Sequence, residues 1–389
     1  MNTMEQNEVY RYFPAGISHA YRGHIVDTRQ VDYIDMMSAW GSNILGYGYR
    51  RVARAVAAQI FKYANVGMVG PEWHRLNEMV LRLVPCAEAI HLVKNGSDAT
   101  AAAIRLARCV TGRNKVVFRG YHGVQDWYMA SIRCPGVPSS HHAEIVRIST
   151  MDVDSLRQIF ATYPDQIACL IIDPMVWPIP DQATMSAVRD TVHEQGALLI
   201  FDEVVSGFRV AIGGAQELWD VLPDLACYGK CIANGLPISM LVGKAQWMEQ
   251  TPSIHYGLTF SLEAVSIVAA VETIDEIVKR RVCLDLAEKG RFLKETYSKL
   301  CHLRGIESAL VGHDCRPELH FTLGNRAESE YFKNIVIHEL GRRRVCSYGT
   351  FNLSYAHTYE DLETVCHALQ YALDRVKAVI ADRRRSQPA

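Results

Sequence analysis

Three polar segments come shortly after apolar runs and carry residue types that chemistry needs. The runs read HLV, ALLIF and LACYG, and the polar residues beyond them are Gly96 with Ser97, then Asp202, and then Lys230. In sheets of parallel strands, ligands bind beyond the carboxyl ends of the strands. If the runs are neighbouring strands, the three segments therefore belong to one site.

Each segment suggests a separate piece of chemistry. Gly96 permits close approach of the backbone and Ser97 suits a helix N-cap, so free amides and the helix dipole there would seat a phosphate. Asp202 at the end of a buried strand needs a cation or a strong donor. Lys230 in such a place would have a lowered pKa and would react with carbonyls. Taken singly, each segment has another interpretation. Gly96 and Ser97 would also fit an ordinary capped turn, Asp202 a structural carboxylate, and Lys230 a lysine whose amine reaches solvent.

A phosphate seat, a buried carboxylate and a nucleophilic lysine are the set that pyridoxal 5′-phosphate (PLP) requires. Its phosphate must be anchored, its aldehyde must be held by a lysine, and its pyridine nitrogen must stay protonated so that the ring accepts electrons. The combination therefore predicts PLP as the cofactor, with Lys230 and Asp202 as the catalytic residues.

The elements that would position these residues alternate regularly between residues 90 and 245. Short apolar runs are separated by amphipathic stretches, of which 97–110 and 182–195 show helical spacing. Runs that are apolar throughout are typical of strands buried on both faces. The pattern therefore predicts an α/β fold with a mostly parallel sheet.

From about residue 263 the pattern changes to long helices with a strand-like piece, ELHFTL, among them. The helices are predicted at 263–281, 284–301, 329–343 and 359–380. Thr358 and Asp361 have the spacing of a capping box for the last of these helices. We therefore expect a large cofactor-binding α/β domain and a smaller α+β domain. The expected boundaries are 1–50 for an N-terminal segment of the small domain, 51–275 for the large domain and 276–389 for the rest of the small domain.

The composition excludes several classes of protein. The chain has 389 residues, 49% of them hydrophobic, and its 41 Lys+Arg and 42 Asp+Glu give a net charge of −1. This balance argues against a nucleic-acid or membrane-surface binder, which would carry a basic excess. The apolar runs are too short to span a membrane, and the N-terminus lacks the features of a secretory signal. The 11 cysteines show neither a CxxC pair nor zinc spacing, so we expect reduced thiols and a cytoplasmic protein.

Eight segments spread along the chain resemble the class III (ω-type) PLP-dependent aminotransferases, and most of all their glutamate-1-semialdehyde 2,1-aminomutase branch. The segments are PAGISHAYR (14–22), YIDMMSAWGSNILGYGYRRV (33–52), NGSDATAAAIRLARCVTGR (95–113), GYHG (120–123), FDEVVSGFR (201–209), DLACYGKCIANGLPISMLVG (224–243), GLTF (257–260) and AHTYEDLE (356–363). The resemblance implies a fold-type I PLP-dependent transferase, whose large domain holds a mostly parallel sheet of the seven-stranded type.

The resemblance also implies which residues bind the cofactor. These are Gly96, Ser97, Tyr121, Asp202, Val204, Lys230 and Thr259. Tyr121 and Val204 would lie on the two faces of the cofactor ring, and Thr259 would reach the phosphate bound by a neighbouring subunit. The expected partner is therefore a second copy of the chain, in a homodimer with shared active sites.

A substrate site is implied in the same way. Arg22 would hold a substrate carboxylate, and Trp40 and Ser18 would line the substrate pocket. Other interpretations stay open for three of the residues. Tyr121 and Trp40 would also fit as core aromatics, and Arg22 as one partner of a surface ion pair.

Four departures from the family's pattern lie around the substrate. The segment after GYHG and the segment YGTFNLSYAHT are shorter than the family's loops, Asp173 replaces a glutamate, and Ser261-Leu262 replace small residues. We therefore expect an aminotransferase with a ping-pong mechanism, an amino-acid donor and a larger carbonyl acceptor, such as a keto-sugar or a specialised-metabolite intermediate. The alternatives are an intramolecular aminomutase, another class III isomerase or decarboxylase, and a non-catalytic binding protein.

Overall fold

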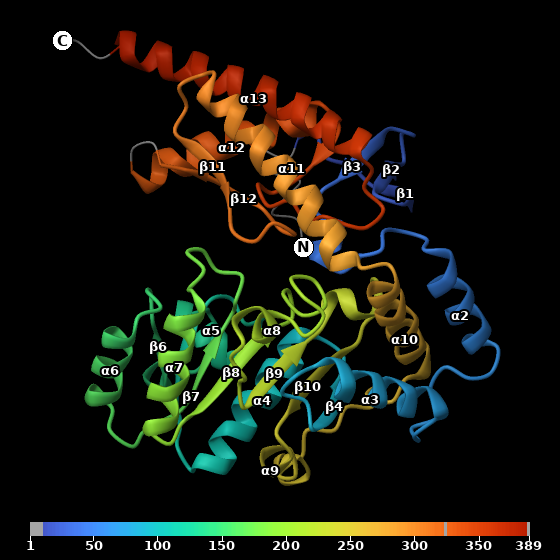
Figure 1. Ribbon diagram of the computed structural model, residues 1–389, viewed down its shortest axis with the longest axis vertical. Helices are drawn as coiled ribbons and strands as arrows, with labels where there is room; N and C mark the ends of the chain where they lie inside the picture. The colour runs from blue at the N-terminus through green and yellow to red at the C-terminus, as the bar shows by residue number, and fades with distance from the viewer. Residues whose placement is uncertain (1–10, 323–324, 387–389) are drawn as a thin grey trace. The chain divides into compact units, whose positions relative to one another are not determined.

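The computed structural model describes residues 11–322 and 325–386. The chain divides into two compact units. The larger unit is Arg50–Arg280, and the smaller one combines the residues up to Tyr49 with those from Arg281 onward. Figure 1 labels helices and strands of both units.

A seven-stranded sheet forms the centre of the larger unit, in the order β4-β10-β9-β8-β7-β5-β6 (Figure 1). The strands are β4 (Ala89–Val93), β5 (Lys115–Arg119), β6 (Ile145–Arg147), β7 (Ile167–Ile172), β8 (Leu198–Glu203), β9 (Leu225–Tyr228) and β10 (Ser239–Gly243). Every residue of β7 and β8 is buried, as the continuous apolar runs predict. The strands from β6 to β9 pair in parallel, whereas β10 is antiparallel to both of its neighbours. The mostly parallel α/β sheet is therefore confirmed.

Some helices of the larger unit pack against this sheet, and others pack against one another. They are α2 (Arg50–Ile60), α3 (Pro71–Leu83), α4 (Gly96–Thr111), α5 (Asp126–Met129), α6 (Val153–Thr162), α7 (Gln182–Glu194), α8 (Ala215–Trp219), α9 (Ala245–Met248) and α10 (Ala264–Lys279). The helix α4 packs against five strands, β4 and β7 to β10. Its face toward the sheet is built largely from buried alanines, which allow close packing. The helix α10 packs against α2 and α3.

The smaller unit joins the beginning of the chain to its last third. Its four-stranded sheet has the order β1-β2-β3-β13, and a second pair of strands is β11-β12. The strands are β1 (Ile17–Tyr21), β2 (His24–Asp27), β3 (Asp32–Asp35), β11 (Ser308–Val311), β12 (Glu318–Phe321) and β13 (Val345–Cys346). The helices are α1 (Ser38–Gly41), α11 (Val282–His302), α12 (Arg326–Arg342) and α13 (Tyr359–Ser386). Because β13 pairs with β3, segments that are far apart in the sequence share one sheet.

The predicted cap of the last helix is present. The backbone N–H of Thr358 donates to the Asp361 carboxylate over 2.8 Å, and the N–H of Asp361 donates to the Thr358 hydroxyl over 3.1 Å. These reciprocal bonds satisfy amides that a helix start otherwise leaves without partners. Among the helices of residues 11–322 and 325–386, none is both long and apolar enough to cross a membrane.

Gly290 in α11 provides a test of the packing in the smaller unit. A Cβ at this position would overlap the carbonyl oxygen of Asp314, which is backbone and cannot rotate away. Gly290→Ala should therefore lower the free energy of unfolding by about 2 kcal/mol or more. Gly257→Ala is the matched control, because a Cβ at Gly257 has no atom within 4 Å. Urea denaturation of both variants checks this, and equal midpoints would contradict the packing described.

Glu203 is a fully buried carboxyl group at the end of β8. It accepts the N–H groups of Ala215 over 2.9 Å and Gln216 over 3.1 Å, and the Ser206 hydroxyl donates to it. Burial raises the pKa of Glu203 to about 7, although these hydrogen bonds oppose the shift. The carboxyl group therefore joins the end of β8 to the start of α8 and keeps a proton near neutral pH.

This raised pKa predicts a pH-dependent stability with a definite sign. The folded chain holds the Glu203 proton up to pH about 7, so its stabilising contribution is complete below the ordinary value of 4.5 and is lost as the pH rises through 7. Glu203→Gln stays neutral and should not lose this contribution. Its free energy of unfolding, compared with that of the wild type, should therefore rise by roughly 3 kcal/mol from acidic to mildly alkaline pH. Denaturation curves over this range test the prediction, and a stability difference that does not change with pH would contradict it.

Candidate active site

Two of the predicted residues lie at the carboxyl ends of neighbouring parallel strands. Asp202 is the fifth residue of β8, is 5% exposed, and pairs in register with Cys227 of β9. Lys230 follows β9 after one intervening residue and opens a short 3₁₀ turn, Lys230–Ala233. The sheet therefore brings this carboxylate and this lysine to the same edge, as expected from ligand binding in such folds.

His122 is the partner that the buried Asp202 needs. Its Nδ1 lies 2.8 Å from the Oδ2 of Asp202, and its Nε2 lies 3.2 Å from the carbonyl oxygen of Arg119. Both partners are oxygen atoms that can accept a hydrogen bond, so the geometry suits donation from each ring nitrogen. The pair is buried, with His122 1% exposed, which makes it a charge-assisted bond in a dry environment. The Oδ1 of Asp202 accepts the N–H of Val204 over 3.2 Å, which fixes the carboxylate further.

The sequence patterns did not single out His122, although it belongs to the GYHG segment. Its role depends on a contact between β8 and the loop after β5, 80 residues apart in the chain. The signal available in the sequence was that His122 follows Tyr121 in the GYHG segment, while the predicted buried carboxylate of Asp202 had no assigned cation. That signal becomes specific only when the strand order is known.

Val204 joins the three predicted segments. A Cβ at Gly96 would lie 2.7 Å from the Cγ1 of Val204, and a Cβ at Gly229 would lie 3.5 Å from the same methyl group. The start of α4, the end of β8 and the residue before Lys230 therefore meet around one side chain. Only glycine fits at position 96 without displacing Val204, because the gap is shorter than ordinary van der Waals contact.

The start of α4 corrects one detail of the sequence analysis. Ser97 was expected as the N-cap, but the N-cap is Asn95 and Ser97 lies in the first turn. The reason is Asp98, whose carboxylate accepts the backbone N–H of Asn95 over 2.8 Å and completes a capping box that starts two residues before Ser97. The amides of Gly96 and Ser97 precede the first intrahelical bond of the helix, so they remain available to an anion.

The loop that carries Tyr121 is anchored on both sides. The Thr100 hydroxyl of α4 donates to the carbonyl oxygen of His122 over 2.8 Å. Gly123, at φ 102°, is packed against Ser97 so closely that a Cβ would overlap it. Tyr121 itself is 57% exposed and contacts Tyr128 edge-on, with ring centroids 5.4 Å apart. A flat aromatic face is therefore presented from a rigid loop, and Tyr121 is not a core aromatic residue.

Lys230 has a constrained backbone. Its φ is 47°, in the left-handed region that a non-glycine residue adopts at a cost. The next residue is held firmly, because the Sγ of Cys231 lies 3.2 Å from the carbonyl oxygen of Gly207. The half-buried lysine side chain therefore starts from a defined point beside Val204.

These residues fit PLP. The start of a 16-residue helix offers free amides for a phosphate, Asp202 with its His122 counter-ion offers a fixed carboxylate, and Lys230 offers an amine. When bound, the cofactor supplies an electron sink for a carbanion next to nitrogen. No group of three or more histidine, cysteine or acidic side chains within the described ranges is arranged to hold a metal ion.

Thr259 is the predicted cofactor residue in the turn before α10. It is exposed, and its carbonyl oxygen accepts the Nδ2–H of Asn65 over 3.2 Å. This bond fixes the turn to the segment between α2 and α3. A second bond nearby, from the N–H of Ala264 to the carbonyl oxygen of Ala64 over 2.8 Å, does the same.

The three predicted substrate residues belong to the smaller unit. Ser18 is exposed on β1, and Arg22 lies between β1 and β2 with φ 49°. Trp40 is 59% exposed and stacks on Tyr348, with centroids 4.7 Å apart and an interplanar angle of 17°. Trp40 is therefore not a core aromatic residue. It lies in a turn of four consecutive residues with positive φ, Ser38–Gly41, of which only the last is glycine.

Comparisons with known proteins agree with this geometry. The profile of the family "Aminotransferase class-III" matches residues 6–309. The 3-aminobutyryl-CoA aminotransferase of Cloacimonas acidaminovorans is 33% identical over 381 residues, which cover 95% of this chain and 91% of that protein. The glutamate-1-semialdehyde 2,1-aminomutase of Methanocaldococcus jannaschii is 33% identical over 337 residues, which cover 81% and 79%.

A solved structure has the same fold. The PLP internal-aldimine form of the FumI protein of Sphingopyxis sp. MTA144 superposes with a TM-score of 0.87 at 27% identity, covering 97% of this chain and 91% of that one. A transaminase with PLP bound superposes with a TM-score of 0.88 at 21% identity, covering 94% and 92%. The fold, the site and these matches lead to one assignment: the chain belongs to the class III aminotransferases and is a PLP-dependent transaminase.

Proposed function

We propose that the chain moves an amino group from an α-amino acid to a larger carbonyl compound by a ping-pong mechanism, as a cytoplasmic biosynthetic enzyme. The observation that carries the proposal is the meeting of Gly96, Asp202 and Gly229, the residue before Lys230, around Val204. This arrangement supports binding of a phosphate, a ring nitrogen and a carbonyl carbon in one place. A keto-sugar or a specialised-metabolite intermediate is the acceptor class that we propose.

Within this proposal, Lys230 holds the cofactor's carbonyl carbon. The Lys230 amine would also be the group that carries the proton leaving the donor's α-carbon. Asp202 would face the pyridine nitrogen, and the bond to His122 would keep the Asp202 carboxylate correctly turned. Gly96 and Ser97 would bind the phosphate, and Tyr121 and Val204 would pack on the two ring faces.

Three observations support a larger acceptor. The segment after GYHG folds into the short turns α5, Ala130–Ile132 and Ser139–Glu144, which lie close to the sheet edge at β6. The carboxylate of Asp173 is turned toward its own loop, where it accepts the N–H of Met175 over 2.9 Å. One relative with 33% identity is named for a coenzyme A thioester, which is a bulky substrate class.

An intramolecular aminomutase is the second candidate function. Its support is the 33% identity to the Methanocaldococcus jannaschii enzyme over most of both chains. A transaminase exchanges two substrates, whereas an aminomutase converts one substrate without a co-substrate. The two functions therefore differ in stoichiometry.

We also propose that the active form is a homodimer. Five exposed apolar side chains lie at the end of α2 and in the segment before α3, and we call them the apolar patch: Ile60, Phe61, Val66, Met68 and Val69, with exposed fractions of 56%, 91%, 50%, 68% and 50%. Large exposed apolar patches mark interaction sites. The patch is tied to the Thr259 turn through Asn65, so a second copy bound there would meet Thr259. This supports a role for Thr259 at the partner's phosphate, and it supports shared active sites.

Purified enzyme loaded with PLP should show near-visible absorption from the cofactor bound to Lys230, and Lys230→Ala should lack it. An α-amino acid alone should abolish this absorption and release about one equivalent of keto acid per subunit. Lys230→Ala should lower kcat by at least about a thousandfold, because both the holding group and the proton carrier are lost. Full conversion of a single substrate with no keto acid released would favour the aminomutase, and a protein that stays colourless with added PLP would refute both functions.

Phe61→Glu should convert the dimer to a monomer, because a charge at the most exposed position of the patch opposes burial. Light scattering after size-exclusion chromatography measures the mass, and activity should fall with it. Leu303→Glu is the matched control, since Leu303 is 75% exposed but lies in the other compact unit. A Phe61→Glu protein that remains dimeric, or a wild type that is monomeric, would contradict the proposed interface.

A further inference from the structure

The turn from β1 to β2 places Arg22 on a rigid base. Its N–H donates to the carbonyl oxygen of Tyr47 over 3.0 Å, and its own carbonyl oxygen accepts the N–H of Tyr47 over 2.7 Å. The φ of Arg22 is 49°, a value that the surroundings must maintain. The side chain is exposed, and its guanidinium makes no hydrogen bond or ion pair with the described part of the chain. A fixed backbone thus carries an unpaired cation.

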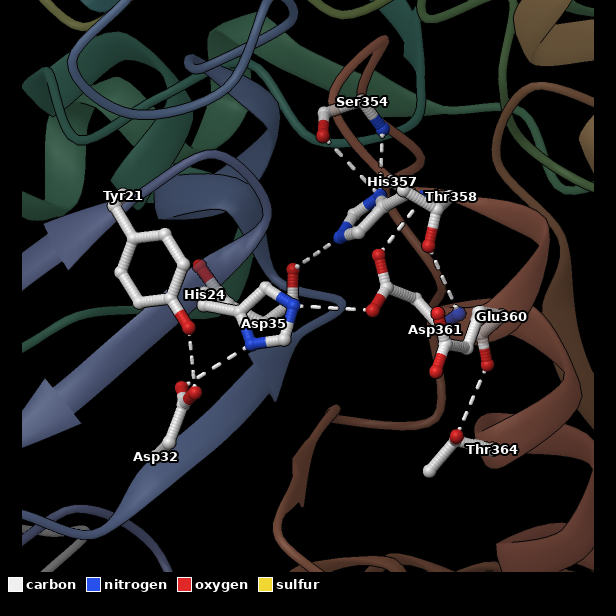
Figure 2. Close-up of polar contacts among 10 residues, drawn as sticks. All are labelled: Tyr21, His24, Asp32, Asp35, Ser354, His357, Thr358, Glu360, Asp361 and Thr364. Carbon is white, nitrogen blue, oxygen red and sulfur yellow. Dashed lines mark hydrogen bonds and ion pairs between the residues drawn. The ribbon is translucent and has the colours of Figure 1, made fainter.

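His24, two residues later, is held between two carboxylates (Figure 2). Its Nδ1 lies 3.1 Å from the Oδ1 of Asp32, and its Nε2 lies 3.0 Å from the Oδ1 of Asp361. Both partners accept, so both nitrogens must donate and the ring must be an imidazolium. The hydrogen bond with Asp361 raises the pKa of His24 above its ordinary 6.5, although partial burial opposes this.

Tyr21, on the other side of Arg22, is attached to the same carboxylate. Its hydroxyl donates to the Oδ2 of Asp32 over 2.6 Å, and its ring stacks on that of His24 with centroids 5.1 Å apart and an interplanar angle of 15°. Figure 2 shows Asp32 receiving bonds from both residues. The two side chains that flank the Arg22-Gly23 tip are therefore clamped to one acid.

The second carboxylate bonded to His24, that of Asp361, belongs to the start of α13. Burial disfavours ionisation of Asp361, but hydrogen bonds from His24 and Thr358 lower its pKa to about 2. Beneath the tip, a Cβ at Gly23 would overlap the ring of His357, which is 1% exposed. The Nε2 of His357 lies 3.1 Å from the carbonyl oxygen of Asp35, and burial lowers its pKa to about 4. His357 is thus a buried neutral ring packed against Gly23, next to the charged group formed by His24, Asp32 and Asp361, which we call the clamp.

We propose that His24, held between Asp32 and Asp361, is a positioning residue that fixes the Arg22 turn and so sets how tightly the enzyme holds a substrate carboxylate. The inference rests on the proposed role of Arg22. Arg22 makes the contact with the carboxylate, and His24 acts through it by tying the β1–β2 turn to β3 and to α13. A preorganised cation loses little entropy on binding, which is the physical advantage of such a clamp.

The clamp depends on pH in one direction. The groups that face His24 are Tyr21 from β1, Asp32 and Asp35 from β3, Asp361 from α13, and His357 from the loop before α13. Since the pKa of His24 is raised in the folded chain, the stabilisation is complete below 6.5 and is lost as the pH rises through the raised value. A neutral ring would turn a lone pair toward one carboxylate, so carboxylate binding should weaken on the alkaline side.

The test compares a donor that has a carboxylate with an amine that lacks one. The half-reaction is followed by loss of cofactor absorption. The donor with a carboxylate is L-alanine or L-glutamate, whichever reacts faster, and the donor without one is isopropylamine. His24→Gln should raise KM for the amino acid about tenfold, with kcat and the isopropylamine reaction unchanged. Arg22→Met should raise KM similarly, and adding His24→Gln to it should change KM by less than about twofold. His367→Gln, an exposed histidine of the same helix as Asp361, is the matched control.

The outcomes separate the inference from the function on which it rests. If Arg22→Met leaves KM unchanged, the proposed role of Arg22 fails, and the inference fails with it. If Arg22→Met raises KM but His24→Gln does not, only the positioning role of His24 is overturned. Equal effects of His24→Gln in the presence and absence of Arg22 would show that His24 does not act through Arg22.

A second measurement needs no variant of His24. Proton NMR of the holoenzyme should show a histidine that titrates above 6.5 and whose pKa falls in Asp361→Asn. The wild-type KM for the amino acid should rise over the same pH range, while that for isopropylamine should not. A His24 resonance that titrates at or below 6.5, or a KM that does not follow it, would overturn the proposal.

Discussion

The bond between His122 and Asp202 is the interaction on which the site depends. Asp202 is buried at the end of a strand whose every residue is buried, where an unpaired carboxylate is strongly disfavoured. The His122 ring, in contact with two oxygen atoms, supplies the missing hydrogen-bond partner. Breaking such a pair from one side costs more than the pair contributes, so the loop that carries His122 must be held in place.

The rest of the site can be understood as support for that pair. Thr100 fixes the backbone of His122 from α4, and Gly123 lets the loop pass directly over Ser97. These contacts place Tyr121 and the free amides of α4 at the same edge as Asp202. The smaller unit has a similar arrangement at His24, whose ring also lies between two acceptors. In both units a buried or half-buried histidine thus joins a turn or loop to a neighbouring element.

Much of this architecture was predictable from the sequence, for identifiable reasons. The continuous apolar runs predicted buried strands, and β7 and β8 are buried throughout. The antiparallel direction of β10 was not predicted, because apolar periodicity carries no information about strand direction. The N-cap shifted from Ser97 to Asn95, because the Asp98 side chain decides between two good capping residues. His122 and His24 were missed, because each is defined by a partner 80 or 337 residues away.

The central claim is that Asp202, held in place by its bond to His122, is the residue that keeps the cofactor's ring nitrogen protonated. The direct measurement is the ¹⁵N chemical shift of ring-labelled PLP bound to the wild-type enzyme and to Asp202→Asn. The account predicts a protonated pyridine nitrogen in the wild type across the neutral pH range, and an unprotonated one in the variant. An unprotonated nitrogen in the wild type, or the same shift in both proteins, would contradict it.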